Sequence, residues 1–328
     1  MAADQAAVPV ASARAAGHGT PLAHPDRAHK HAVWHRLRRH PGAIAGASVF
    51  TVVALAVLFG SFVHGVDPHY LDYRAKNQGM SLAHPLGTDN LGRDTFARLL
   101  AGGRLSLAVG VAAMALSLTV GTVIGVLSGF FRRLDGPLMR FTDLFLALPV
   151  LPLLMVTTML FREPLRAALG LEAGIFVLVV GVIGITSWMQ TARIVRGQVL
   201  AIRAREYVTA ARSIGARPWR IIGRHVFPNA LSPIVVAATL DIAAAIITES
   251  ALSFLGLGFP SDFPTWGRLL YDGVPFLTLT PDRVIWPGLA ISLTVLSVNF
   301  LGDGLRDALD PHATAASRGS RPPRRTQA

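Results

Sequence analysis

Two carboxylates lie inside one long apolar stretch of the sequence. Asp241 and Glu249 fall within residues 230–255, where most neighbours are Ala, Ile, Val or Leu. An ionised carboxylate at the centre of a membrane span costs about 2.5–3.5 kcal/mol on insertion scales, so such groups usually face a polar cavity or a partner. Two interpretations stay open: the pair lines a path that favours a cationic or zwitterionic solute, or it hydrogen bonds within a helix bundle.

A second group of polar residues crowds into one short stretch: His84, Asp89, Asn90, Arg93 and Asp94. Residue types alone would permit a metal or catalytic site, but the stretch lacks the paired histidines of a zincin helix. Asp and Asn beside Gly are typical of turns and helix caps. We therefore expect a structural role here, with no catalytic residue and no metal site.

The sequence also lacks the residues needed to hydrolyse a nucleotide. A P-loop requires Gly-Lys-Ser/Thr after a glycine-rich turn, and neither Lys30 nor Lys76, the only two lysines, follows a glycine. Cysteine is absent, which excludes disulfides and thiolate metal ligands. We expect a chain that is not an enzyme and binds no cofactor, so that any ATP-driven step belongs to another polypeptide.

The elements that must position these residues are membrane spans. Hydrophobic residues make up 52% and charged residues 15% of the 328 positions, and the mean hydropathy is +0.47. Lipid offers backbone amides no partner and no stretch alternates with period two, so the sequence predicts an all-α membrane protein with six transmembrane helices. Each is near the length that crosses a core of about 30 Å. The predicted spans are residues 42–63, 105–131, 144–161, 173–188, 230–255 and 284–301.

Proline and glycine predict local features of two spans. Prolines remove backbone hydrogen bonds, so Pro149 and Pro152 should kink the third span. Glycines at helical spacing on the second span allow close helix contacts. These glycines are Gly110, Gly121, Gly125 and Gly129.

Basic residues predict the orientation, because Lys and Arg accumulate on the cytoplasmic side. Placing both termini inside assigns most of the 31 Lys and Arg residues to the two tails and to the second and fourth connections. These flanking arginines account for the net charge of +12, so nucleic-acid binding is not expected. We expect disordered cytoplasmic tails at 1–33 and 312–328, a first span with an outer loop at 34–104, and a core transmembrane domain at 105–311.

The fourth connection is basic and amphipathic. Its small and apolar residues recur at helical spacing, so the fourth span should continue as one helix to Gly215, which suits a left-handed helix end. Pro218 should open a second short helix, and Pro228 should end it. Ala210 and Ala211 are small enough to let another backbone approach. Composition alone leaves two roles open: a helix pair lying on lipid head groups, or a docking element for a partner protein.

The alanine pair followed by Gly215 and Pro228 resembles the cytoplasmic loop of ABC importer permeases. Three further stretches resemble the dipeptide/oligopeptide/nickel branch of that family: residues 84–110, 134–149 and 249–267. One span before an outer loop resembles the second permease subunit of such systems. The resemblance covers roughly residues 34–311.

The resemblance implies a type I ABC importer permease fold in the bacterial cytoplasmic membrane. It implies a permease subunit that moves peptides or a related small solute inward by alternating access. The implied partners are a second homologous permease, two ATP-binding ABC subunits, an extracytoplasmic substrate-binding protein and membrane lipid. An ion-coupled secondary carrier without an ATPase, and a membrane-embedded enzyme, are the alternatives.

In this family the loop forms a coupling helix that sits in a groove of the ATPase. The acidic residue that often precedes the alanine pair is Thr209 here, and Glu206 one turn earlier could replace it. The path carboxylates would then favour the amino end of a peptide. The coupling residues implied are Glu206, Thr209, Ala210, Ala211, Gly215, His225 and Pro228.

Overall fold

The computed structural model describes residues 35–309, so the two predicted tails lie outside the described residues. Within that range the chain is helical, and the only β pairing is an isolated bridge between Thr88 and Asp94. The predicted all-α class is therefore confirmed. The α-helices are α2 (Pro41–His64), α3 (Thr95–Phe130), α4 (Arg132–Leu146), α5 (Val150–Leu169), α6 (Leu171–Arg203), α7 (Glu206–Ser213), α8 (Pro218–Ile221), α9 (Phe227–Phe254), α10 (Trp266–Gly273) and α11 (Asp282–Leu309).

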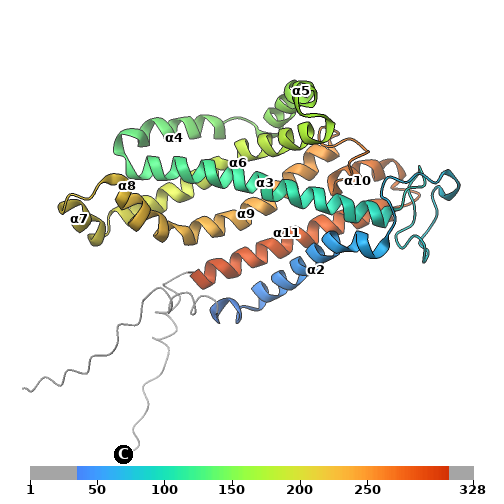
Figure 1. The fold of residues 1–328 in the computed structure, drawn as a ribbon, viewed down its shortest axis with the longest axis horizontal. Coiled ribbons are helices and arrows are strands. Elements are labelled where there is room, and N and C mark those ends of the chain that lie inside the picture. Colours follow the sequence, from blue (N-terminus) through green and yellow to red (C-terminus); the bar gives the residue numbers. More distant parts are fainter. Residues whose placement is uncertain (1–34, 310–328) are drawn as a thin grey trace, which may run out of the picture.

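The long helices form one bundle (Figure 1). α3 packs along α6 and also contacts α9, while α2 packs mainly against α11. Figure 1 shows α7, α8 and both ends of the described chain toward one end of the bundle, which we call the α7 end. The opposite end, which we call the α10 end, carries α10 and the segment between α2 and α3. Both described ends thus share one side of the bundle, as an even number of spans requires.

Among the described residues, five helices are long and apolar enough to cross a membrane, and α4 with α5 forms a sixth candidate bent by 86°. The span predicted at residues 144–161 is divided between two helices, because the chain breaks after Leu146. Pro149 lies directly before α5 with extended backbone, which a proline favours and which a helix interior does not permit. The predicted kink is present, and it is a break between two helices.

α3 begins at Thr95, ten residues before the predicted span, and ends at Phe130. Asp94 caps it by accepting a hydrogen bond from the Ala97 amide at 2.6 Å. Its third turn contains Arg104, which donates to the carbonyls of Val57 and Leu58 on α2 at 2.8 and 2.7 Å. The arginine in the early part of α3 thus finds its hydrogen-bond partners on a neighbouring helix. The domain boundary expected at residue 104 falls inside this helix.

The glycines of α3 allow close contact with α6, as predicted. A Cβ added at Gly121 or Gly125 would lie 2.7 Å from atoms of α6, and one added at Gly129 would lie 2.8 Å from Val199. Real Cβ atoms do not approach this closely. The two helices therefore touch backbone against side chain along three turns.

The connection between α6 and α9 differs from its prediction at two points. α6 runs to Arg203 and then breaks at Ala204 and Arg205, so the fourth span does not continue into α7 as one helix. Pro228 does not end the following helix, because residues Pro218–Phe254 form one continuous span. A π turn at Ile222–Val226 precedes the proline, whose ring would clash with the carbonyl one turn earlier in a regular α-helix.

Candidate functional site

The α7–α8 segment, residues 206–221, is a helix, a tight turn and a second helix. Gly215 follows α7 with φ of +79°, the left-handed conformation that glycine adopts without a Cβ penalty. The Ala216 amide donates to the Ala211 carbonyl at 3.1 Å, which closes the end of α7. Pro218 is the first residue of α8. The predicted roles of Gly215 and Pro218 in the turn are confirmed.

One face of the segment is fixed to the bundle. Val208 of α7 and Val226 of the π turn are fully buried, and Ile221 is 1% exposed. They pack in one apolar cluster with α3 and α6, whose contributions are Val126, Phe130, Val195, Val199 and Ile202. Because interiors are close-packed, a displacement of α7 is passed to α3 and α6.

The other face of the segment is open. Ile214 at the turn is 85% exposed and Trp219 is 66% exposed. Ala210 is exposed as well, whereas Ala211 is buried against the apolar cluster. The expectation that both alanines admit a partner is therefore corrected: only Ala210 faces outward. The segment and the following π turn also carry four exposed arginines, namely Arg212, Arg217, Arg220 and Arg224.

The remaining residues implied for coupling lie on or beside this face. Glu206 and Thr209 are exposed on α7, and Glu206 has no ion-pair partner among residues 35–309. His225 in the π turn is half-buried, with its ring 6.0 Å from that of Tyr207. Pro228 is exposed in the first turn of α9. The structure thus gathers the predicted set at the α7 end.

Asp241 joins three helices near the middle of the bundle. Its Oδ2 accepts hydrogen bonds from Ser117 of α3 at 3.0 Å and from Thr191 of α6 at 2.9 Å. The residue is half-buried. Among the described residues no Arg or Lys pairs with it. Both the path and the bundle interpretations remain compatible with this geometry.

Glu249 is fully buried on the same helix. Its two oxygens accept hydrogen bonds from Ser106 of α3 at 3.1 Å and from Ser253 at 2.7 Å. The Ser106 hydroxyl also accepts from the Trp266 amide at the start of α10, at 3.2 Å. Glu249 therefore links α9, α3 and α10, and it has no exposed surface that a solute could touch in this structure.

The polar stretch before α3 is built into the α10 end of the bundle. Asp89 accepts hydrogen bonds from Arg93 at 2.7 Å and from Arg98 at 2.9 Å. Burial alone would raise the pKa of Asp89, but the hydrogen bonds and charges of these arginines outweigh it, so its pKa lies below the ordinary value. Asp89 also accepts from the Leu91 and Arg93 amides, and Asp94 caps α3, which agrees with the interpretation of this stretch as turn and cap chemistry.

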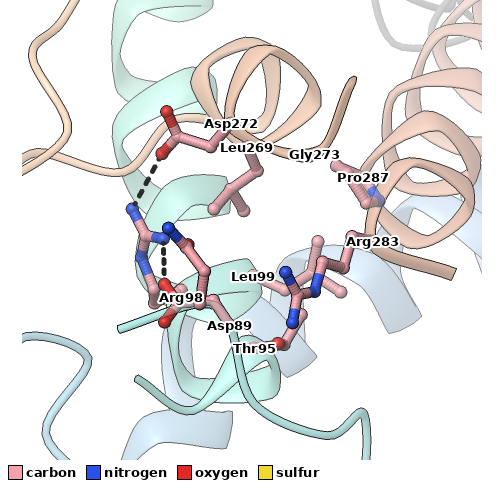
Figure 2. Close-up of a pocket in the computed structure, with 10 residues that line it drawn as sticks. Asp89, Thr95, Arg98, Leu99, Leu269, Asp272, Gly273, Arg283 and Pro287 are labelled. Atoms are coloured by element: carbon pink, nitrogen blue, oxygen red, sulfur yellow. Dashed lines mark hydrogen bonds and ion pairs between the residues drawn. The ribbon is translucent and has the colours of Figure 1, made fainter. Parts of the chain in front are cut away.

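Sequence reasoning missed the distant members of this network. Arg98 also reaches Asp272 of α10 at 3.4 Å (Figure 2). Asp272 in turn accepts a hydrogen bond from Arg268 at 2.9 Å. Arg283 of α11 donates to the Thr88 carbonyl at 2.9 Å. The sequence did show arginines at the edges of apolar spans, which could have indicated such a network. Their partners lie far away in the sequence, so no local pattern predicts which residues pair.

Comparison with known proteins places the chain in a family. Residues 121–315 match the family described as binding-protein-dependent transport system inner membrane component. A glutathione transport system permease protein of Pectobacterium atrosepticum is 39% identical over 85% of this chain and 89% of its own length. The chain belongs to this family. It is a membrane permease subunit, and its match at residues 31–85 to the N-terminal transmembrane domain of oligopeptide transport permease C agrees with the predicted branch.

Two further relatives of the permease carry related names. An oligopeptide transport system permease protein of Bacillus subtilis is 39% identical over 84% of this chain and 87% of its own length. A dipeptide transport system permease protein of Alkalihalophilus pseudofirmus is 37% identical over 84% and 88%. None of these relatives is named as an ion-coupled carrier.

A solved structure shares the permease fold. One chain of the MetNI methionine ABC transporter, in an inward-facing conformation, aligns with a TM-score of 0.54 at 20% identity. The alignment covers 65% of this chain and 97% of that chain. The predicted type I importer permease fold is confirmed.

Proposed function

We propose that this permease carries peptides or a related small solute into the bacterial cytoplasm, in an importer driven by separate ATP-binding subunits. The relatives named for glutathione, oligopeptide and dipeptide transport support this substrate class. The proposed assembly contains a second homologous permease, two ATP-binding subunits and an extracytoplasmic substrate-binding protein, in the lipid of the inner membrane. Both termini lie in the cytoplasm, and the α10 end faces outward.

The observation that carries the proposal is the two-sided packing of the α7–α8 segment. Its inner face is fixed to α3, α6 and α9 through the buried apolar cluster. Its outer face offers apolar Ile214 and Trp219, and the same segment and the π turn carry exposed arginines. Apolar anchors with a charged rim are typical of protein docking surfaces. We propose that an ATP-binding subunit holds this face, and that its closure on ATP moves the bundle between inward-open and outward-open states.

We propose a further division of labour between the two carboxylates. Asp241 is half-buried at the junction of α3, α6 and α9 and would favour the amino end of a peptide in the path. Glu249, implied for the path as well, would act by holding α10 to α3 and α9. We propose that residues 34–104 form a peripheral part of the permease and that residues 105–311 form its translocating core. The boundary between the two parts falls inside α3.

Substitution of the exposed alanine tests the coupling proposal. Ala210→Trp should abolish ATP-dependent uptake by cells that contain the complete transporter, because the larger side chain prevents close approach of the partner. Its level in the membrane should stay normal. Ala45→Trp, at an exposed position of α2, is the matched control and should leave uptake intact. Normal uptake in the Ala210→Trp variant would contradict the coupling role.

A further inference from the structure

A small cavity lies at the α10 end between α3, α10 and α11. Its lining includes Thr95 and Arg98 of α3, Asp272 of α10, and Arg283 of α11 (Figure 2). The space accommodates one or two water-sized molecules and is partly open. The cavity is far from the α7–α8 segment and plays no part in the proposed coupling.

Two polar atoms beside this cavity have no partner. The Arg283 Nη1 and the Thr95 Oγ1 are both buried and make no hydrogen bond within residues 35–309. Figure 2 shows the Arg283 guanidinium directed toward Thr95 across the space between α11 and α3. Buried polar atoms in folded proteins are almost always satisfied, by protein, water or an ion. Two orphaned groups that converge on one space therefore indicate a bound species.

The charge of Arg283 determines which kind of species fits. Arg283 is 8% exposed and its contacts are neutral: Nη2 donates to Asn77 Oδ1 at 2.7 Å and to the Thr88 carbonyl, and the guanidinium lies over the Phe276 ring. Among the described residues it forms no ion pair. Buried charges are normally paired, because an isolated charge in a low dielectric is costly.

The carboxylates that line the cavity are engaged elsewhere. Asp89 accepts from Arg93 and Arg98, and Asp272 accepts from Arg268 and Arg98. Asp89 and Asp282 act on Arg283 by their charge, but neither forms an ion pair with it. Of the buried arginines Arg93, Arg98 and Arg283, Arg283 alone has no ion pair among the described residues, and it lies beside the orphaned hydroxyl.

We propose that this cavity is a binding site for a small monovalent anion of about the size of chloride. The anion accepts hydrogen bonds from Arg283 Nη1 and from the Thr95 hydroxyl, and it neutralises the buried guanidinium. It joins the first turn of α3 to the first turn of α11. Occupancy therefore stabilises the α10 end of the bundle, and the stability of the permease depends on the anion in solution.

Thermal unfolding of the purified full-length permease in detergent tests the site. Sodium chloride is replaced stepwise by sodium gluconate, whose anion is too large for the cavity, at constant ionic strength. Chloride should raise the Tm along a saturable curve, by about 2–4 °C when it is several-fold above its Kd. Bromide should act like chloride.

Three variants separate a specific site from a general salt effect. Arg283→Gln should lose the chloride response, and Thr95→Val, which keeps shape and charge, should need several-fold more chloride for half of the shift. Arg193→Gln removes an exposed arginine that pairs with Asp143, and it should respond as the unaltered chain does.

Two results would overturn the proposal. Equal Tm values in chloride and gluconate for the unaltered chain would mean that the cavity holds only water. An undiminished chloride response in Thr95→Val and Arg283→Gln would mean that the ion acts elsewhere. If Arg283→Gln does not fold, the response of Thr95→Val decides the question alone.

Discussion

Replacement of Gly125 by alanine tests the close packing of α3 on α6. The added Cβ would lie 2.7 Å from both the Ala192 carbonyl and the Val195 Cβ, where ordinary contact begins at 3.4 Å. The helices must therefore separate by roughly 1 Å or distort, and such overpacking costs about 1–3 kcal/mol. Alanine also gains about 1 kcal/mol over glycine as a helix former, so the net loss is about 0–2 kcal/mol.

Gly197 on α6 provides the matched control. A Cβ added there meets nothing within 4 Å, so Gly197→Ala gains the helix propensity without the clash. The two variants should differ by about 1–3 kcal/mol, with Gly125→Ala lower by several degrees in Tm. The assay is thermal unfolding of the full-length permease in detergent, followed by its soluble monodisperse fraction. A Gly125→Ala variant as stable as Gly197→Ala would refute the close-packing argument.

Three further predictions concern single residues. Arg98→Met removes the arginine shared by buried Asp89 and half-buried Asp272, each of which keeps one other arginine, so the free energy of unfolding should fall by about 1–3 kcal/mol; an unchanged Tm would show that the network adds little. Ala211→Trp should lower the Tm by several degrees because it overfills the apolar cluster, whereas Ala210→Trp should not; equal stabilities would contradict the assigned faces. Asp241→Asn can still accept the two hydroxyl hydrogen bonds, so it should fold normally while uptake of peptides with a positively charged amino end falls several-fold; unaltered uptake would remove Asp241 from the path.

The spans that the sequence predicts best are those whose ends are marked locally. α2 was expected at residues 42–63 and forms at Pro41–His64, between a proline at its first turn and Gly65 in the left-handed conformation. The turn at Gly215 was predicted for the same reason, because a glycine without Cβ and a nearby proline define it. Local chemistry is sufficient for such boundaries.

The errors arise where distant contacts decide the outcome. α3 begins ten residues early because Arg98 and Arg104 find partners on α10 and α2, and a hydropathy pattern does not contain those contacts. Pro228 stays within a helix because a π turn precedes it. Which alanine of the pair faces outward also depends on the apolar cluster, to which α3 and α6 contribute.

The position of the α7–α8 segment is the claim on which the transport mechanism rests. The chain has no cysteine, so Ile214→Cys, at a position 85% exposed, introduces a single reactive thiol. A membrane-impermeant maleimide should label it in inside-out vesicles and not in intact cells, and bound ATP-binding subunits should protect it. Labelling of Ile214→Cys from outside intact cells would contradict the account.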